Sequence, residues 1–482
     1  MSTAVTGADE RPVHGAAGAA AYRPPRRAHL LMASTAVGLV TTLLYTVFSW
    51  RQWARFQVPS WDLGIFTQIL RAYSEGRAPV VPIKGEGFMI LGDHFHPLLV
   101  VLAPVYAAFP SGLTLLAAQA VLVGISAVVV TWCAVRHLGR LPGTTLGLAY
   151  GLSWGLQSAV ASQFHEVALA LPFLALSLAA LVRRDHRAAA LWALPMVLIK
   201  EDLGLTVAAI GVVIVIRGSR RLGAALAVGG VAAFVITTRV VLPALNPDGV
   251  WDYADDSIVS VLFTDPGAAL NGLFTGVGHK AALVLLVFGV TGFLALRSPL
   301  ALITLPTFAW RLTSDVPFHW SADWHYSAVL MPIVFLAVVD TFVTARGARR
   351  FAAPVGIGAL ILALVITVWF PLWKLTEPET YAPSHQDAAA RQVLELIGDG
   401  AVVDTDITMM AYLAPRADVY WVGNEGNPVP DYVVVNRQSG IYGGNPPSDV
   451  VEYATSKFPG ETFVEVLDSD GFLVAEHVPQ AN

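Results

Sequence analysis

Long apolar segments, separated by short polar or basic intervals, occupy most of the first 371 residues of this chain. Residues 30–48, 113–135 and 354–370 each have about the 20-residue length that a helix needs to cross a lipid bilayer. Followed along the chain, the pattern gives about 11 transmembrane helices. The chain is therefore predicted to be a polytopic α-helical membrane protein.

The charged residues between the apolar segments predict an orientation. Basic clusters such as residues 183–187 and 217–221 recur at alternate ends of the segments, while most acidic residues fall at the other ends. Cytoplasmic loops of membrane proteins carry an excess of Lys and Arg. We therefore expect the N-terminus to be cytoplasmic and the C-terminus to be extracytoplasmic.

The same pattern divides the chain into three parts. Residues 1–28, rich in Ala, Gly, Pro and Arg, are predicted to be a disordered cytoplasmic tail. Residues 29–371 form the transmembrane domain, with residues 50–97 as an outer loop. In residues 372–482 the long apolar runs end, which indicates a small extracytoplasmic soluble α/β domain. Its expected strands are 401–403, 419–422, 432–435, 463–466 and 472–475, and its expected helices are 386–397 and 407–413.

Composition supports this class of protein. Apolar residues make up 55% of the chain and charged residues 13%, and the mean hydropathy is +0.60, which is far from a soluble average. Cys133 is the single cysteine, so an internal disulfide is excluded. The net charge is -5, and no basic run interleaved with aromatic residues indicates nucleic acid as a partner.

The outer loop 50–97 contains the first candidate for chemistry. After Asp62, the apolar residues Ile65, Phe66, Ile69 and Leu70 recur every three or four positions, which predicts a helix lying on the membrane surface. Near the start of such a helix, Asp62 could simply interact with the helix dipole. Aimed into a membrane-facing cavity, the same carboxylate could act as a general base.

The end of this loop concentrates three more polar side chains. Asp93, His94 and His96 occur within four residues, directly before Pro97. These residue types bind divalent metals and transfer protons. Asp93 could also begin a helix, because an Asp followed shortly by Pro suits a helix start.

Two later polar groups are expected on the same outer side. His165 and Glu166 lie at the boundary of an apolar segment, and Lys200, Glu201 and Asp202 separate two half-length apolar segments. Three adjacent charges at membrane depth are costly unless they line a wet cavity. One interpretation is an interfacial pair and a self-neutralised hairpin; the other is a phosphate-binding Lys200 held by carboxylates.

Arginine and histidine residues further along complete the candidate set. Arg239, inside an apolar segment, and Arg311 could bind phosphate, because the guanidinium fork matches phosphate oxygens bidentately. His319 and His325 lie in the last outer loop, which either closes over a substrate or is simply polar. Asp406 is expected to cap the helix 407–413.

Four motifs together resemble the signatures of the bacterial membrane-protein family called domain of unknown function 2079. They are WDLGIF at 61–66, GDHFHP at 92–97, FHE at 164–166 and KEDLG at 200–204. The resemblance covers residues 30–345, with a further similar pattern at 412–435. That family in turn resembles the GT-C glycosyltransferases, such as protein mannosyltransferases and lipid A aminoarabinose transferases.

The resemblance implies a GT-C-like fold in the bacterial plasma membrane. It also implies an integral-membrane glycosyltransferase that moves a sugar from a polyprenyl-phosphate donor to an envelope glycan, lipid or protein acceptor on the outer face. Asp62 matches the acidic residue of the first outer loop at the sugar-transfer centre, and Lys200 matches the Lys between paired short helices. The chain departs from many members in lacking an adjacent Asp-Glu pair in that loop.

In this mechanism Asp62 orients or deprotonates the acceptor hydroxyl, while Lys200, Arg239 or Arg311 neutralises the leaving phosphate. Asp93 and Glu166 are the other expected catalytic residues. Because related enzymes differ in metal use, the resemblance also leaves room for a divalent metal, Mg²⁺ or Mn²⁺, at Asp93, His94, His165 and Glu166. The residues expected to bind substrate are His94, His96, His165, Lys200, Glu201, Asp202, Arg239, Arg311, His319 and His325.

Two other classes remain open on the sequence alone. A transporter or lipid flippase would use the half-length segments around residues 200–202 as a midplane site. An envelope assembly protein would instead bind a partner through residues 372–482 and carry a non-catalytic cavity. A cavity open on one side favours transfer, and an aqueous path open on two sides favours transport.

Overall fold

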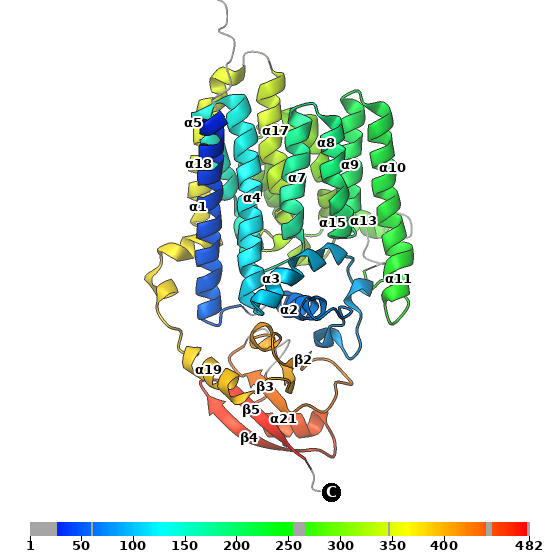
Figure 1. The fold of residues 1–482 in the computed structure, drawn as a ribbon, viewed down its shortest axis with the longest axis vertical. Coiled ribbons are helices and arrows are strands. Elements are labelled where there is room, and N and C mark those ends of the chain that lie inside the picture. Colours follow the sequence, from blue (N-terminus) through cyan, green and yellow to red (C-terminus); the bar gives the residue numbers. More distant parts are fainter. Residues whose placement is uncertain (1–26, 59–60, 254–265, 346–347, 440–445, 480–482) are drawn as a thin grey trace, which may run out of the picture.

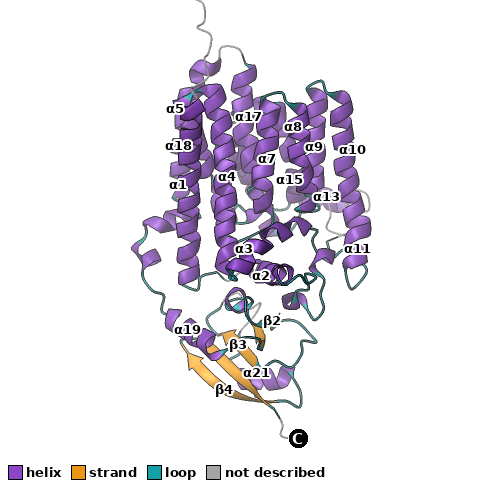
Figure 2. Cartoon of the chain, in the orientation of Figure 1, coloured by secondary structure: helices purple, strands orange, loops and turns teal. Residues whose placement is uncertain are grey.

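A bundle of helices stands above a small sheet domain that lies at one of its ends (Figure 1). The computed structural model describes residues 27–58, 61–253, 266–345, 348–439 and 446–479. Nearly all of the predicted disordered tail, residues 1–28, lies outside these described residues. Within the described chain, strands are confined to the sheet domain (Figure 2).

The helices of the bundle are α1 (Arg27–Ala54), α2 (Trp61–Ser74), α3 (Ala103–Ala108), α4 (Gly112–Leu138), α5 (Arg140–Gly151), α6 (Trp154–Ala161), α7 (Val167–Val182), α8 (His186–Ala193), α9 (Leu203–Ile216), α10 (Arg220–Ile236), α11 (Leu242–Leu245), α13 (Pro266–Phe274), α14 (Val277–Gly289), α15 (Leu305–Thr313), α16 (Pro317–Trp320), α17 (Leu330–Thr344) and α18 (Ala352–Thr367). The sheet domain adds α19 (Asp387–Leu396), α20 (Met410–Leu413) and α21 (Val450–Lys457).

Among the described residues, 4 helices are long and apolar enough to cross a membrane, or up to 5 if one bent pair counts as a single span. The four are Arg27–Ala54, Gly112–Leu138, Arg220–Leu245 and Ala348–Thr367, and the bent pair is Pro317–Ser327 with Leu330–Thr344. The apolar helices α7, α9 and α14 are shorter. The chain is thus a multi-pass helical protein, but the prediction of about 11 spans is not confirmed.

Breaks within the predicted spans explain the difference. The predicted span 143–161 is divided between α5 and α6, and the segment 188–199 is α8 followed by a 3-10 turn, Leu194–Leu198, that contains Pro195. Proline cannot donate a backbone hydrogen bond and clashes with the preceding helical turn. Such breaks are tolerated inside a bundle because neighbouring helices and side chains satisfy the freed backbone groups.

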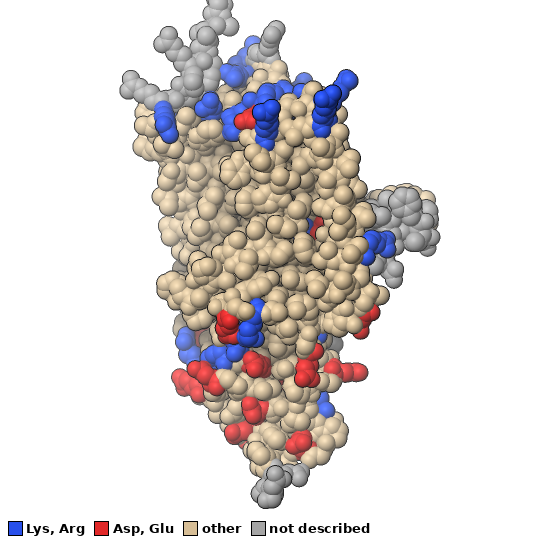
Figure 3. Space-filling model, turned by 45° about the vertical axis from the view of Figure 1, so that its right-hand side comes forward, with Lys and Arg blue, Asp and Glu red and all other residues tan. Residues whose placement is uncertain are grey.

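Charge is distributed unequally over the bundle. Lys and Arg gather at the end away from the sheet domain, a belt largely without charged residues follows, and Asp and Glu prevail around the sheet domain (Figure 3). We call the two ends the basic side and the sheet side. This separation agrees with the asymmetry expected of a membrane protein.

The strands of the sheet domain are β1 (Val402–Thr405), β2 (Asp418–Trp421), β3 (Tyr432–Asn436), β4 (Thr462–Ser469) and β5 (Phe472–Val478). Their order in the sheet is β2-β1-β3-β5-β4. β1 is parallel to both β2 and β3, whereas β5 is antiparallel to β3 and β4. All five strands expected from the sequence are present, and α19 and α20 fall within the two expected helices.

Both faces of this sheet are covered. On one face, Val434 of β3 belongs to the same buried cluster as α19 and α20. On the other face, Val433 and Val435 pack in a second cluster with Val450 and Ala454 of α21. Alternate strand residues therefore face different helices, as strand geometry requires.

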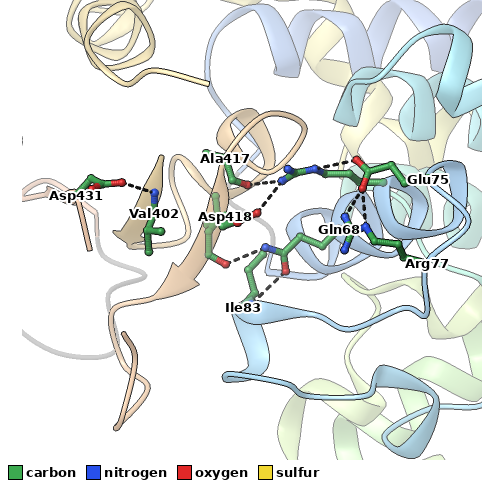
Figure 4. Close-up of polar contacts among 10 residues, drawn as sticks. Gln68, Glu75, Arg77, Ile83, Val402, Ala417, Asp418 and Asp431 are labelled. Atoms are coloured by element: carbon green, nitrogen blue, oxygen red, sulfur yellow. Dashed lines mark hydrogen bonds and ion pairs between the residues drawn. The ribbon is translucent and has the colours of Figure 1, made fainter. Parts of the chain in front are cut away.

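Helix α2 connects the sheet domain to the bundle. Most of its residues are buried, and a side chain at Gly64 would place its Cβ 2.9 Å from Ile83 and 3.1 Å from Met410 of α20. The Gln68 amide donates to the carbonyl of Val419 (2.8 Å) and accepts from the backbone N–H of Ile83 (3.1 Å). The sequence predicts a helix on the membrane surface; α2 lies at the end of the bundle, and the sheet domain covers it on the side away from the bundle (Figures 1 and 4).

A second polar contact fixes the same interface. Arg71 of α2 donates to the carbonyl of Ala417 (2.8 Å) and to the carboxylate of Asp418 (3.1 Å) at the start of β2. Figure 4 shows these two acceptors beside the residues 68–77 of the bundle. The loop 50–97 is therefore held between the bundle and the sheet domain.

Candidate functional site

Asp62 contacts His165 at the sheet side of the bundle. Asp62 is the second residue of α2, and His165 lies in the loop between α6 and α7, where Gln163 adopts a positive φ of 67°. Nε2 of His165 is 3.3 Å from Oδ2 of Asp62, and Nδ1 is 3.2 Å from the carbonyl oxygen of Gln163. Both ring nitrogens of His165 therefore face an oxygen atom.

The charge state of Asp62 follows from its neighbours. Desolvation by the surrounding protein raises the pKa of this carboxyl, but the hydrogen bond and charge of His165, with the charges of Lys200 and His94, outweigh it, and the net pKa is lowered from 3.8. The side chain is 51% exposed, so it can meet a ligand. An ionised carboxylate with a lowered pKa is a weak base, which favours orienting a hydroxyl over removing its proton early.

His325, from a distant part of the chain, contacts His165. Its ring stacks on that of His165, with the centroids 3.6 Å apart and the planes at 23°. His325 lies in the 3-10 turn His325–Ser327 before α17 and is buried. The two histidines predicted in separate loops therefore lie face to face.

Glu166 and Lys200 form a buried ion pair. Oε1 of Glu166 is 2.7 Å from Nζ of Lys200, and the side chains are 3% and 18% exposed. Glu166 directly precedes α7, while Lys200 lies in the turn before α9. The pair thus joins two short apolar helices at the sheet side.

Glu201, next to Lys200, holds the end of the outer loop. Its carboxylate contacts Nδ1 of His94 (2.9 Å) and accepts from the backbone N–H of Phe95 (3.0 Å). Burial lowers the pKa of His94, but the charge and hydrogen bond of Glu201 oppose it, and the net pKa is raised above 6.5. The His94 ring also stacks on Tyr253, with the centroids 4.8 Å apart.

His96 and Asp93 are buried beside these contacts. Burial lowers the pKa of His96 to about 4, so this histidine is neutral at pH 7, with its ring edge-on to Phe66. Oδ2 of Asp93 is 3.5 Å from Nζ of Lys84. A close approach at the preceding residue needs glycine, because a Cβ on Gly92 would lie 2.3 Å from the backbone nitrogen of Asn246.

We call the group formed by Asp62, His94, His165, Glu166, Lys200 and Glu201 the polar cluster. Its members come from four segments that are distant in sequence, and each contacts at least one other member. Asp202 borders the cluster, with a buried Oδ1 that has no partner among the described residues.

Three predicted substrate-binding residues lie differently. Arg311 is fully buried, and its guanidinium donates to the carbonyls of His319 and Ser321 and to the hydroxyl of Ser327, so it organises the loop before α17. His319 contacts the hydroxyl of Ser314 through Nδ1 (2.7 Å). Arg239 is exposed on the helix that continues α10, and no ion pair joins it to the cluster in the described chain. Their roles toward substrate stay predictions.

The four expected metal ligands have separate partners. Asp93 pairs with Lys84, His94 with Glu201, His165 with Asp62 and Glu166 with Lys200. Within the residues that the structure describes, no group of three His, Cys, Asp or Glu side chains is placed to hold a metal ion. The arrangement does not fit one metal site at these four residues, and metal dependence stays a prediction.

Sequence reasoning missed two neighbours of the cluster. Lys84 lies within the polar outer loop, where a lone lysine ahead of Asp93 could have been noted. Tyr253 gives no signal in the sequence, because its role depends on a contact with a ring more than 150 residues away.

Asp406 does not cap a helix as expected. Its carboxylate accepts from the backbone N–H of Thr408 (2.9 Å) and of Asn436 (2.7 Å), and α20 begins only at Met410. Asp406 instead ties the turn after β1 to the end of β3.

Comparison with known proteins identifies a family and a similar solved fold. A family described as predicted membrane protein (DUF2079) matches residues 52–449. The crystal structure of ArnT from Cupriavidus metallidurans bound to undecaprenyl phosphate is similar at 15% identity and a TM-score of 0.55, covering 93% of this chain and 98% of that chain. The apo state of the same protein matches at 14% identity and a TM-score of 0.44, covering 86% and 92%. No curated protein matches the sequence.

Proposed function

We propose that this chain, which belongs to the predicted membrane protein family DUF2079, is an integral-membrane glycosyltransferase. It moves a sugar from a polyprenyl-phosphate donor to an envelope glycan, lipid or protein on the outer face of a bacterial plasma membrane. The fold supports the proposal at the level of architecture, because it resembles ArnT, a GT-C glycosyltransferase. The bound undecaprenyl phosphate of ArnT suggests the class of lipid carrier.

The polar cluster is the observation that carries the proposal. It combines a half-exposed, ionised Asp62 with a lysine whose charge is fixed by a buried carboxylate. Transfer from a phosphate-linked sugar needs a group that orients the acceptor hydroxyl and a cation that stabilises the leaving phosphate. Asp62 takes the first role and Lys200 the second, and the sugar inverts at its anomeric carbon.

Lys200 suits the second role better than the two arginines. The donors of Arg311 contact loop oxygens, and Arg239 is exposed outside the cluster. Lys200 retains a side chain that is 18% exposed while it contacts Glu166. The location of the cluster at the sheet side alone also favours transfer over transport, because a transporter needs a site reachable from both sides.

The test is transfer from a panel of radiolabelled polyprenyl-phosphate sugars by the full chain in proteoliposomes. Asp62→Asn keeps the size of the side chain and removes its charge, and we expect a fall of about 100-fold or more in kcat. Asp399→Asn, at a carboxylate that is 83% exposed in the sheet domain, is the matched control. Transfer at the full rate by Asp62→Asn would contradict the role of Asp62, and no transfer from any donor would favour the transporter. Addition of EDTA tests the metal separately.

A further inference from the structure

A pocket separate from the polar cluster lies between α1 and the sheet domain. Its volume is about 690 Å³, within the range of roughly 300–1,000 Å³ typical of small-molecule sites. The outer end of α1, the linker between residues 374 and 386, and the loops of the sheet domain form its walls. None of its lining residues belongs to the polar cluster.

The topology of the sheet explains why a pocket forms here. β1 lies between its two parallel neighbours, β2 and β3. After β1 the chain passes through α20 to β2, and after β3 it continues to α21. Because α20 and α21 cover opposite faces of the sheet, the loops after β1 and β3 separate. In open α/β sheets, ligands bind at such a switch point, outside the carboxyl ends of the strands.

The pocket lies at these strand ends. Thr408 follows β1, and Asn436, Gln438 and Ser439 end and follow β3; all four line it. Amide and hydroxyl groups of this kind recognise hydroxyl-bearing ligands, because they both donate and accept hydrogen bonds.

The membrane-domain wall adds positive charge. Arg51 of α1, Arg55 directly after α1 and Lys374 of the linker line the pocket, and Glu379 is the only carboxylate among its lining residues. Arg51 is positioned by two hydrogen bonds to the carbonyl of Thr380 (2.9 and 2.8 Å).

Arg55 shows that this wall has unused donors. Its Nε is buried, and it has no partner among the described residues; the same holds for Oε1 of Gln52, also in the pocket lining. A buried polar atom without a partner is costly, while the Arg55 side chain as a whole stays partly exposed in the pocket lining. Arginine is also the side chain best matched to phosphate oxygens.

We propose that this pocket binds a phosphate-bearing, hydroxyl-rich group, with Arg55 and Lys374 contacting the phosphate and the exposed amide of Gln438 contacting the hydroxyls. The group is either a soluble sugar or polyol phosphate or the headgroup of an anionic lipid. The inference is independent of the transferase proposal, because it uses no residue of the polar cluster.

The test uses the full chain in nanodiscs. For the soluble source, sn-glycerol 3-phosphate is titrated by calorimetry into protein in phosphatidylcholine discs. For the lipid source, native mass spectrometry counts phosphatidylglycerol retained from mixed discs. Arg55→Gln and Lys374→Gln remove one charge each, and Arg77→Gln, at an exposed arginine paired with Glu75, is the matched control.

Either saturable binding of sn-glycerol 3-phosphate or retention of phosphatidylglycerol is expected, weakened about tenfold or more by each pocket variant and unchanged by the control. Hydrogen exchange at residues 377–386 and 436–439 should slow when the ligand binds. Lys374 is exposed, so its variant keeps the test valid if Arg55→Gln fails to fold. Absence of both kinds of binding, or equal binding by both variants and wild type, would overturn the inference.

Discussion

The Glu166–Lys200 pair gives the sharpest test of how the polar cluster is held together. The two charged groups are 2.7 Å apart, and their side chains are 3% and 18% exposed. Removal of one partner from a buried pair leaves the other charge uncompensated, which costs about 3–5 kcal/mol. The surroundings of the two residues differ, so the two single substitutions should not cost the same.

Lys200→Met should be the more damaging of the two. Without Lys200, the Glu166 carboxylate is almost fully buried and loses its hydrogen-bonded cation, so we expect a loss of about 3–5 kcal/mol. In Glu166→Gln, Lys200 keeps the adjacent carboxylates of Glu201 and Asp202 and reaches water, so the loss should be about 1–3 kcal/mol. The double variant should lose less than the sum, with a coupling of about 1–2 kcal/mol.

The free energy of unfolding can be measured by titrating dodecyl sulfate into mixed micelles and following the helical circular dichroism. Arg77→Met, which removes an exposed partner of Glu75, should change it by less than about 0.5 kcal/mol. Additive single losses, or a larger loss for Glu166→Gln than for Lys200→Met, would refute the reasoning.

Two further predictions use the same unfolding measurement. Burial lowers the pKa of His96 from 6.5 to about 4. The stability that neutral His96 contributes is therefore complete above pH 6.5 and is lost as the pH falls toward 4. The loss is about 3 kcal/mol, at 1.4 kcal/mol per pKa unit. His96→Gln should remove this part of the acid sensitivity, and an unchanged difference in unfolding free energy between pH 7.5 and 4.5 would contradict it. Gln68→Leu should lower the free energy of unfolding by about 2–3 kcal/mol, because it leaves the Val419 carbonyl and the Ile83 N–H unpaired. It should also speed hydrogen exchange in β2. The control is Gln57→Leu, at an exposed glutamine.

The elements of the sheet domain are readable from the sequence because their signal is local. Alternating residues such as Val433, Val434 and Val435 face different helices, and this periodicity predicts β3 directly. Helix α21 was not predicted, since only Val450 and Ala454 of its residues are buried. Its start still carries a signal, because Asp449 accepts hydrogen bonds from the next turn and Glu452 follows three residues later.

The polar cluster is only partly readable, because its contacts are long-range. The charge pattern predicts that Asp62, His165 and Lys200 share one side of the bundle, and the structure brings them together. Which carboxylate holds which cation depends on how α2, α7 and α9 pack, and no spacing in the sequence records that. Arg311 shows the reverse case: three oxygens within 16 residues of it occupy its donors, a local arrangement that its position in an apolar segment does not reveal.

The orientation predicted from charge can be tested with very little interference. Cys133 is fully buried within α4, so a membrane-impermeant maleimide should leave the wild-type chain unlabelled in intact cells. Asp399→Cys places a thiol at a side chain that is 83% exposed on the sheet domain, and Arg220→Cys places one at the exposed start of α10 on the basic side.

If the basic side is cytoplasmic, the reagent labels Asp399→Cys in intact cells and labels Arg220→Cys only after the membrane is permeabilised. The reason is the same asymmetry that Figure 3 shows, because basic loops are retained in the cytoplasm during insertion. The opposite labelling pattern would place the sheet domain and the polar cluster in the cytoplasm. A polyprenyl-phosphate sugar presented on the outer face could not then reach Asp62, so this result would also remove the proposed donor.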